Sequence, residues 1–486
     1  MKIYLPQWET EREAPRGTRL SEVLYAFLGE MWSTPCGGNG TCGKCAVTWN
    51  GKEVLSCQTR LEEDGTVLLP ESVVAGGMVQ KCLAVLTEFS PELGEADGSD
   101  DYGLAVDLGT TTLAAALVRG GQVLGTVSRM NPQARYGQNV ISRIGFSLTE
   151  PNGARTLQEL LLRSIKEMAL ELCAQAGIAF SEIGRGVFAG NTTMEETLLG
   201  LNLESLSGIP FLPSTDFQTE TEALFPGMRV RLFPVMGGFV GGDITAGLLA
   251  ARPGADTLFL DLGTNGEMVL TLDSARLACA AAAGPALEGA EISCGMRAGF
   301  GAIESVTFDS AASEFRFHTL GDVPRPVGIC GSGLIDLLAL LLDGGDLTPD
   351  GRLVGGKPWE LCEGISLTQA DVRQLQLAIG AIRAGIQILL KKGGRRPEDL
   401  RMLAVAGGLG RSLNIRNAQR VGLLPVEVPA ERIAFLGNTS LCGAILALNR
   451  EALWRTSFGI AAGTTCFDLS QEPDFTDTFV ACMEWK

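Results

Sequence analysis

The feature that most constrains the fold is the motif Asp-Leu-Gly-Thr, which occurs twice between apolar segments. It lies in LAVDLGTTTLAAALV at 104–118 and again in LFLDLGTNGEMVLTL at 258–272. Each copy is typical of two neighbouring strands joined by a tight turn. Because Asp107 and Asp261 are far apart in the sequence, we expect two related subdomains that face each other rather than a solenoid of short repeats.

The residues of these two turns indicate phosphate chemistry. Successive backbone N–H groups and hydroxyls can bind phosphate oxygens, and an aspartate at the end of a strand can hold hydrated Mg²⁺. One such turn is common in ordinary hairpins, whereas two favour a nucleotide site. We therefore expect Asp107 and Asp261 to be catalytic, and the turn residues to bind nucleotide, namely Gly109, Thr110, Thr111, Thr112, Gly263, Thr264 and Asn265.

Other glycine-rich turns favour the same site. The segments GICGSGL at 328–334 and LAVAGGLGRSLN at 403–414 are each typical of an apolar strand, a glycine turn and a helix. Glycine allows the backbone to approach a nucleotide closely. GGDITAGLLA at 241–250 predicts a similar turn and helix, and FLGNTSLCGA at 435–444 a small-residue turn that closes the cleft. From the first two segments we expect nucleotide contacts by Gly331, Ser332, Gly407, Gly408 and Gly410.

A second chemistry is indicated by four cysteines near the N-terminus. Cys36, Cys42, Cys45 and Cys57 lie in CGGNGTCGKC and the later LSCQT, with tight glycine turns that let several thiolates converge. Zinc is the alternative, but only Cys42 and Cys45 form the Cys-x2-Cys pair that is typical of it. We expect a [2Fe–2S] cluster held by these four residues. The stretch GNGTCGK at 38–44 also approaches the P-loop pattern G-x4-G-K, but cysteine follows it where Ser or Thr would bind magnesium.

Composition and charge exclude several classes of function. A net charge of −17 argues against nucleic-acid binding. The longest apolar stretch is too short to span a membrane, and the first residues have no apolar export segment, so we expect a cytoplasmic protein with reduced thiols. The single histidine, His318, lies in the alternating run FRFHTL and is expected on a strand surface, not in catalysis.

The sequence predicts an N-terminal domain, a linker and a larger C-terminal domain. Residues 1–88 have their own strand and helix pattern, and residues 89–102 are rich in Asp and Glu with no Lys or Arg, which is typical of a linker. From 103 to 486, strands alternate with helices, as in α/β architecture, and the second subdomain is expected to start near 257.

Two known folds are implied by resemblance. CGGNGTCGKC and LSCQTRL resemble the plant-type and adrenodoxin-type ferredoxins, which implies a β-grasp domain with a [2Fe–2S] cluster. The glycine turns from 103 to about 447 resemble the ATPase superfamily of actin, the heat-shock chaperones and the sugar kinases. That likeness implies two ribonuclease-H-like subdomains with ATP and Mg²⁺ between them, and the segment at 406–410 against the adenosine.

The combination is similar to the reductive activators of corrinoid proteins. MNPQARYGQNVISRI, AGNTTMEETLLGL, GPALEGAEISCGMRAGFGAIESV and GLGRSLNIRNAQRVGLLP extend the resemblance over most of the chain. It implies ATP-dependent transfer of one electron to a Co(II) corrinoid protein, restoring Co(I) for methyl transfer, with an upstream low-potential electron donor and a possible homodimer. The chain departs from the family at Asn139, Glu196 and Ile379, where Asp, His and Lys are expected.

Three other functions remain open. Activators of 2-hydroxyacyl-CoA dehydratases share the ATPase fold, but they hold a [4Fe–4S] cluster between subunits and have no ferredoxin domain. A metabolite kinase or a chaperone-like ATPase would leave the cysteines without a role. A plain electron carrier would make no use of the two Asp-Leu-Gly-Thr turns.

Overall fold

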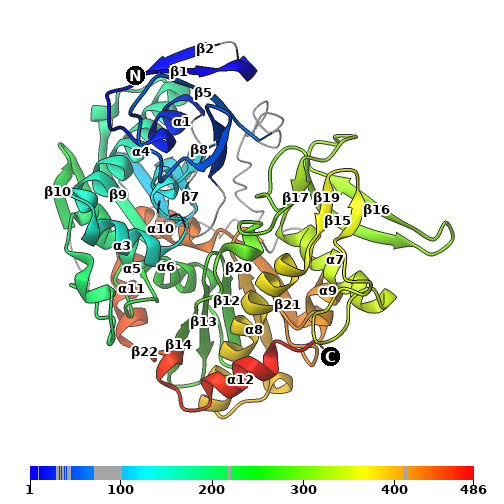
Figure 1. The fold of residues 1–486 in the computed structure, drawn as a ribbon. Coiled ribbons are helices and arrows are strands. Elements are labelled where there is room, and N and C mark those ends of the chain that lie inside the picture. The colour runs from blue at the N-terminus through cyan, green and yellow to red at the C-terminus, as the bar shows by residue number, and fades with distance from the viewer. Residues whose placement is uncertain are drawn as a thin grey trace.

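Three large β-sheets organise the parts of the chain that the computed structural model describes (Figure 1). These parts are residues 1–8, 10–28, 45–70, 101–215, 220–409 and 413–485, together with residues 32, 34, 38 and 40. Cys36, Cys42, Gly410 and most of the predicted linker at 89–102 lie outside the described residues. Among the described residues, no helix is long and apolar enough to cross a membrane.

The N-terminal sheet has five strands in the order β2-β1-β5-β3-β4. β1 pairs antiparallel with β2 but parallel with β5, so the chain between β1 and β5 must cross the sheet. Helix α1 lies in that connection, and its buried Leu20 and Leu24 pack in one core with Ile3 and Leu5 of β1. The bounds are β1 Lys2–Leu5, β2 Thr10–Glu13, α1 Leu20–Leu28, β3 Ala46–Trp49, β4 Lys52–Leu55 and β5 Gly65–Leu68.

Two six-stranded sheets repeat one arrangement. Their orders are β10-β11-β9-β6-β7-β8 and β21-β20-β12-β13-β14-β22. In each sheet, three consecutive strands form an antiparallel meander (β6-β7-β8 and β12-β13-β14), and the first of the three pairs in parallel with a later strand. The expectation of two related α/β subdomains is thereby confirmed. The first sheet contains β6 Tyr102–Leu108, β7 Thr112–Arg119, β8 Gln122–Met130, β9 Ile183–Gly190, β10 Glu220–Phe225 and β11 Met228–Leu232.

Helices α6 and α10 join these two sheets in one central core. The core combines side chains of α6 (Gly242–Ala251), α10 (Thr439–Asn449) and α11 (Glu451–Ala462) with residues of both sheets. A Cβ atom at Gly443 of α10 would lie 2.1 Å from the backbone oxygen of Ala246, so glycine is what permits this close crossing. The second sheet contains β12 Thr257–Leu262, β13 Gly266–Thr271, β14 Arg276–Ala281, β20 Met402–Ala406, β21 Ile433–Gly437 and β22 Thr464–Cys466.

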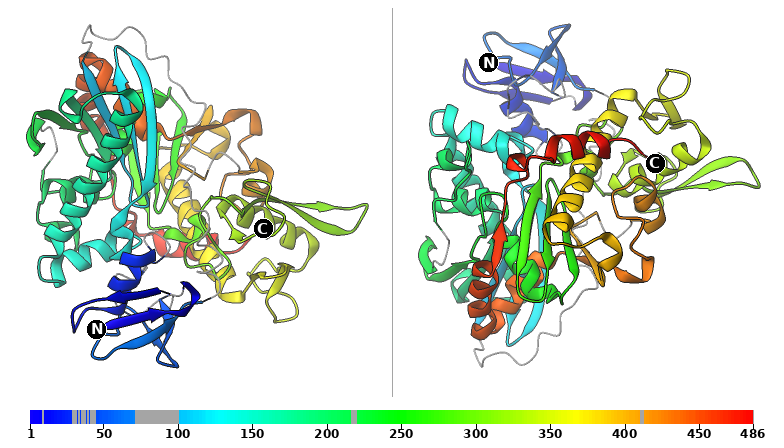
Figure 2. Two further views of the ribbon diagram at one scale, coloured as in Figure 1. Left: turned by 90° about the horizontal axis from the view of Figure 1, so that it is seen from above. Right: turned by 90° about the horizontal axis from the view of Figure 1, so that it is seen from below.

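Further helices cover the outer faces of the two halves (Figure 2). The longest, α4 and α8, have 24 residues each. Helix α4 buries side chains at intervals of three or four positions, which matches the helical repeat, whereas more than half of the residues of α8 are buried. On the first half lie α3 Val140–Thr149, α4 Gly153–Ala176 and α5 Thr192–Leu199. On the second lie α7 Gly331–Gly344, α8 Gln369–Lys392, α9 Ile415–Arg420 and α12 Phe475–Cys482.

A smaller three-stranded sheet extends from the second half, in the order β16-β15-β17. Its strands are β15 Ala302–Asp309, β16 Glu314–Thr319 and β17 Gly328–Ile329, and β18 Trp359–Cys362 pairs with β19 Ile365–Leu367 nearby. His318 lies on β16 with 54% of its side chain exposed, as the alternating pattern predicts, and its ring nitrogens contact Glu304 and Asp322.

Candidate functional site

The two Asp-Leu-Gly-Thr turns face each other across the junction of the two halves. The first joins β6 to β7 and the second joins β12 to β13. Their tips meet at two hydroxyls, because Thr111 Oγ1 lies 2.9 Å from Thr264 Oγ1. Both side chains are buried, with exposed fractions of 9% and 6%. The sequence repeat is therefore also a spatial pair.

A cavity of about 670 Å³ lies between the turns. It is large enough for a nucleotide-sized ligand. The predicted residues that line it are Asp107, Gly109, Thr110, Thr111, Thr112, Asp261, Gly263, Thr264, Asn265, Gly331, Ser332, Gly407 and Gly408. Gly410 was predicted with them and lies outside the described residues.

Neighbouring backbone atoms lie so close to Gly109 and Gly407 that only glycine fits at these two positions. A Cβ atom at Gly109 would lie 2.3 Å from the backbone oxygen of Thr112. At Gly407, φ is +92°, and a Cβ atom would lie 2.3 Å from Leu262 O and 2.9 Å from an Asp261 oxygen. Any side chain at either position would push the turn out of the cavity wall.

Asp107 is held in place by the junction of β21 and α10. Asn438 Nδ2 and Ser440 Oγ each donate a hydrogen bond to its carboxylate, both at 2.8 Å. Burial raises the pKa of Asp107 to about 6, and the two hydrogen bonds oppose this rise. A buried carboxylate that is costly to leave charged is suited to a cation that arrives with the ligand.

Three of the other carboxylates that line the cavity also have raised pKa values. Burial raises the pKa of Asp261 to about 7, and repulsion from Asp107 adds to this rise. Burial and the neighbouring aspartates also raise the pKa values of Asp243 and Glu267. These acids lie close enough to repel each other, yet no group of three His, Cys, Asp or Glu side chains in the described residues could hold a metal ion. Mg²⁺ commonly uses only one or two carboxylates, together with phosphate and water, so this donor set suits a metal that enters with a nucleotide.

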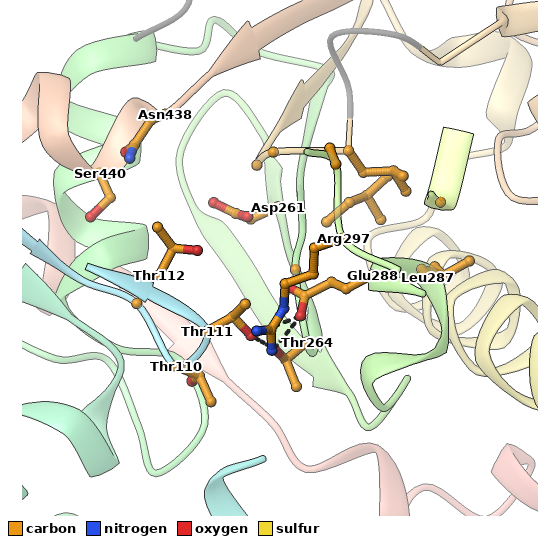
Figure 3. A pocket seen from close by; sticks show the side chains of 18 of the residues that line it. Thr110, Thr111, Thr112, Asp261, Thr264, Leu287, Glu288, Arg297, Asn438 and Ser440 are labelled. Carbon is orange, nitrogen blue, oxygen red and sulfur yellow. Dashed lines mark hydrogen bonds between the residues drawn. The ribbon is translucent and has the colours of Figure 1, made fainter. Parts of the chain in front are cut away.

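A carboxylate joins the two turns directly (Figure 3). Thr111 Oγ1 donates to Glu288 Oε2 at 2.7 Å, and Thr264 Oγ1 lies 3.3 Å from the same oxygen. The side chain of Arg297 points toward this group from the cavity wall (Figure 3). Glu288 is the last residue of the short helical turn Pro285–Glu288, and Arg297 precedes β15.

Arg143 supports the first turn from behind. It is 1% exposed and donates to Thr110 O, to Gly137 O at 2.9 Å and to Gln133 Oε1 at 3.0 Å. Burial, and then repulsion from Arg297, lowers the pKa of Arg143 to about 9. The guanidinium therefore remains charged at neutral pH and fixes the backbone of the first Asp-Leu-Gly-Thr turn.

Replacing Arg143 with methionine is expected to destabilise the protein by about 3 kcal/mol or more, because several buried acceptors would lose their donor. Thermal unfolding in the absence of nucleotide measures this change. Arg155→Met is the control, because the Arg155 side chain is 77% exposed and pairs with Glu159 on the surface, where an ion pair contributes little. Equal melting temperatures for the two variants would contradict this role of Arg143.

Two of the four predicted cluster cysteines can be described. Cys45 and Cys57 are each 1% exposed and belong to the core of the N-terminal sheet. Gln58 Nε2 donates to Cys57 Sγ at 3.7 Å, and it also bonds the carbonyl of Gly38. Gly38 has φ +83°, as a sharply turning loop requires. Buried thiols with an N–H donor beside a glycine turn fit an iron–sulfur ligand set.

Residues in the connections of the N-terminal sheet contact the segment that supports the first Asp-Leu-Gly-Thr turn. Arg19 Nη2 lies 3.1 Å from Glu150 Oε1, and Thr34 Oγ1 donates to the backbone oxygen of Arg135. The guanidinium of Arg135 lies over the Tyr25 ring, 4.7 Å from its centre. The same segment, between β8 and α4, contains Arg143.

The motifs contain several site residues that the sequence did not single out. Asn191, Asp243, Glu267, Glu288, Arg297, Glu304, Asn438 and Ser440 all line the cavity. Asp243 lies in the segment 241–250 and the pair Asn438 and Ser440 in the segment 435–444, for both of which the sequence predicts a turn near the same site. An acidic residue beside a glycine turn in an apolar segment could have identified Asp243 as a site residue. No repeat or motif spacing identifies Glu288 or Arg297 as site residues.

The three departures from the family pattern do not line the cavity. Asn139 caps helix α3 and accepts a bond from Ser142 N at 2.9 Å. Glu196 is buried in α5 and accepts from Ser214 N. Ile379 is fully buried in α8, within the core of the second half. Each of the three residues therefore contributes to the packing or capping of a helix and does not line the cavity.

Comparison with known proteins connects these features to one family. Residues 102–252 match the family model described as the RACo middle region, and residues 255–486 match the model described as the C-terminal domain of RACo, the ASKHA domain. The chain is 28% identical to the corrinoid activation enzyme RamQ of Eubacterium limosum, over 99% of this chain and 98% of that protein. It is also 28% identical to the [Co(II) methylated amine-specific corrinoid protein] reductase of Methanosarcina barkeri, over 73% and 70%.

A solved structure agrees over the whole length. A reductive activator for corrinoid, iron-sulfur protein superposes with a TM-score of 0.72 at 30% identity, and the match covers 100% of this chain and 98% of that one. The ASKHA match accords with the duplicated sheets and the cavity between them, and it indicates ATP as the ligand. The chain belongs to the RACo family of reductive activators of corrinoid proteins.

Proposed function

We propose that the chain is an ATP-dependent activator that transfers one electron from a [2Fe–2S] cluster to a corrinoid protein in the Co(II) state. The product is the Co(I) state that methyl transfer requires. The observation that carries this proposal is the match over the full chain to a reductive activator. The paired turns and the cavity between them support the use of ATP.

We assign a separate function to each part of the chain. A ferredoxin-like, β-grasp domain at 1–88 carries the electron, the acidic linker at 89–102 tethers it, and the ATPase domain at 103–486 drives the cycle, with its second half starting near 257. The mixed N-terminal sheet, in which β1 is parallel to β5 and antiparallel to β2, supports a β-grasp fold for residues 1–88. The start of β12 at Thr257 supports a second half of the ATPase domain that begins near 257.

Within the ATPase domain, we assign metal binding to the two aspartates. Asp107 and Asp261 hold hydrated Mg²⁺ that accompanies ATP, which offsets their mutual repulsion. The hydroxyls and N–H groups of the two turns bind phosphate oxygens. The glycine turns at Gly331–Ser332 and Gly407–Gly408 admit the rest of the nucleotide, because their lack of bulk leaves room in the wall.

In the N-terminal domain, Cys36, Cys42, Cys45 and Cys57 are the proposed ligands. A bound [2Fe–2S] cluster supplies a one-electron carrier with a potential of about −400 mV in plant-type ferredoxins. The burial of Cys45 and Cys57 keeps water from the ligand sulfurs, and Gln58 orients Cys57. An upstream low-potential electron donor must reduce the cluster again after each transfer.

Reduction of a corrinoid to Co(I) is harder than reduction of such a carrier, so the transfer must be coupled to ATP. A ligand can shift a conformational equilibrium only through contacts that differ between the two states. The segment between β8 and α4 is suited to this coupling, because Arg143 holds the first Asp-Leu-Gly-Thr turn while Arg135 contacts Tyr25 of helix α1, which packs on the N-terminal sheet. The partner is a corrinoid protein, and a homodimer is a further proposal from the family resemblance.

Restoration of methyl transfer tests this function. A corrinoid methyltransferase system is first oxidised until its corrinoid protein is in the Co(II) state. Adding the protein with a low-potential reductant and ATP is expected to restore methyl transfer, whereas ADP is expected not to. Systems that use methylamines, aromatic methyl ethers and the acetyl-CoA pathway should each be tried, because partner choice depends on surface shape. Failure in all of them, or equal restoration without ATP, would refute the function.

A further inference from the structure

Arg19 lies against the loop that contains the proposed cluster ligands. Its Nη1 atom is 3.5 Å from the position that a Cβ atom of Gly38 would take, and that position is 4.0 Å from Cys57 Cβ. The backbone beside Arg19 is tied to the same place, because Ser21 N donates to Ser56 O at 3.1 Å, directly before Cys57 in the chain. The guanidinium is therefore held beside the proposed ligand set.

A carboxylate of the ATPase domain pairs with this guanidinium. Arg19 Nη2 lies 3.1 Å from Glu150 Oε1, and the two side chains are 25% and 37% exposed. Glu150 is the C-cap residue of helix α3, so it belongs to the first half of the ATPase domain. A single ion pair thus separates a charge of the ATPase domain from the loop of the cluster ligands.

Positive charge borders this loop from both domains. Arg135 of the ATPase domain lies over the ring of Tyr25, and it lines one small pocket together with Arg19 and Gly38. Among the described residues that line this pocket, the acid is Glu22, whose residue is exposed. Reduction adds one negative charge to an iron–sulfur cluster, so positive charge at this place favours the reduced state.

We propose that Arg19 is a positioning residue that raises the reduction potential of the cluster, and that Glu150 of the ATPase domain weakens this effect through the ion pair. This inference rests on the proposed [2Fe–2S] cluster. Net charge near a cluster is one of the features by which a protein sets its potential. The partial burial of both side chains keeps water from screening their charges completely.

Helix α3 connects this ion pair to the nucleotide cavity. Arg143 of α3 donates to Thr110 O of the first Asp-Leu-Gly-Thr turn, whereas Glu150 ends the same helix and donates from its N–H to Phe146 O. A shift of α3 would change the contact between Glu150 and Arg19. The ion pair therefore gives the nucleotide site a route to the electron carrier that requires no change in the cluster ligands.

Two substitutions with opposite expected shifts test this role. Arg19→Gln removes the positive charge and should lower the equilibrium constant for reduction of the cluster about 3- to 10-fold, which corresponds to roughly 30 to 60 mV for a one-electron couple. Glu150→Gln removes the opposing charge and should raise that constant about 2- to 5-fold. A purely structural ion pair would give shifts of the same sign, because each variant breaks the same contact. Anaerobic redox titration of the full-length protein, followed by the visible absorption of the cluster, measures both constants.

Control variants remove the same charges from exposed ion pairs. Arg16→Gln breaks the pair with Glu62 in the N-terminal domain, and Glu159→Gln breaks the pair with Arg155 on helix α4. Each should change the constant less than about twofold, because solvent and salt screen these charges.

Arg19→Lys provides a second reading if Arg19→Gln incorporates the cluster poorly. It keeps the charge and should recover part of the shift. Shifts of the same sign in Arg19→Gln and Glu150→Gln, or shifts no larger than in the controls, would overturn this role of Arg19 and leave the proposed function intact. Absence of a [2Fe–2S] spectrum in the reconstituted, unchanged protein would instead refute the proposed function, and this inference with it.

Discussion

Replacing Asp107 with asparagine is expected to slow ATP turnover by about 100-fold or more, while the visible spectrum of the iron–sulfur cluster stays unchanged. The carboxylate lies at the end of β6 and faces the cavity, where it is proposed to hold hydrated Mg²⁺. A bound metal supplies several kcal/mol of transition-state stabilisation, and each 1.4 kcal/mol corresponds to about tenfold in rate. Steady-state phosphate release measures the loss.

The matched control for this substitution is Asp336→Asn. Asp336 is also buried, at 3% exposed, but it bonds Val306 N and Asn417 and lies outside the cavity lining. Its loss should lower stability without changing turnover per folded molecule by a comparable amount. Normal ATP turnover in the Asp107 variant would remove Asp107 from the catalytic site.

Replacing Cys57 with alanine is expected to abolish the visible [2Fe–2S] absorption and electron transfer, while ATP binding remains. Cys57 is one of the four proposed ligands, and it lies in the core of the N-terminal sheet, on a separate sheet from the cavity residues. Cys42→Ala should behave in the same way, because loss of any thiolate leaves an incomplete ligand set. Absorption spectra after anaerobic reconstitution, together with nucleotide titration, provide the two readings.

Cys173→Ala is the control for these cysteine variants. Its thiol is buried, at 2% exposed, in helix α4 of the first half, so it removes a comparable group without touching the proposed ligands. The spectrum of this variant should match that of the unchanged protein. If ATP binding collapsed in the Cys57 variant but not in the Cys173 variant, the assignment of separate electron and nucleotide modules would be wrong.

The repeated motif made the centre of the site predictable from sequence. Asp107 and Asp261 each lie near the end of an apolar strand within the same four-residue motif, so the repeat alone predicted that they lie opposite each other. The structure confirms that geometry through the contact between Thr111 and Thr264. The glycine turns at Gly331 and Gly407 were predictable for a related reason, because a turn that ends beside a ligand leaves no room for a side chain.

The remaining residues of the site depend on tertiary contacts that no local pattern reveals. Asn438 and Ser440 reach Asp107 from more than 300 residues away. Glu288 and Arg297 lie in an irregular segment, and only the folded chain brings them to the junction of the two turns. Arg143 would pass for a surface residue of a helix until its three oxygen acceptors are seen around it.

The most direct test of the central claim follows cobalt during a single electron transfer. The purified protein is reduced under anaerobic conditions and mixed with a purified corrinoid protein in the Co(II) state, and the absorption of Co(I) is recorded over time. With MgATP, Co(I) is predicted to appear as the iron–sulfur absorption returns to its oxidised form. With MgADP, or with the Cys57→Ala variant and MgATP, it is predicted not to appear. Formation of Co(I) at the same rate without ATP, or none with ATP from any class of corrinoid protein, would contradict the account.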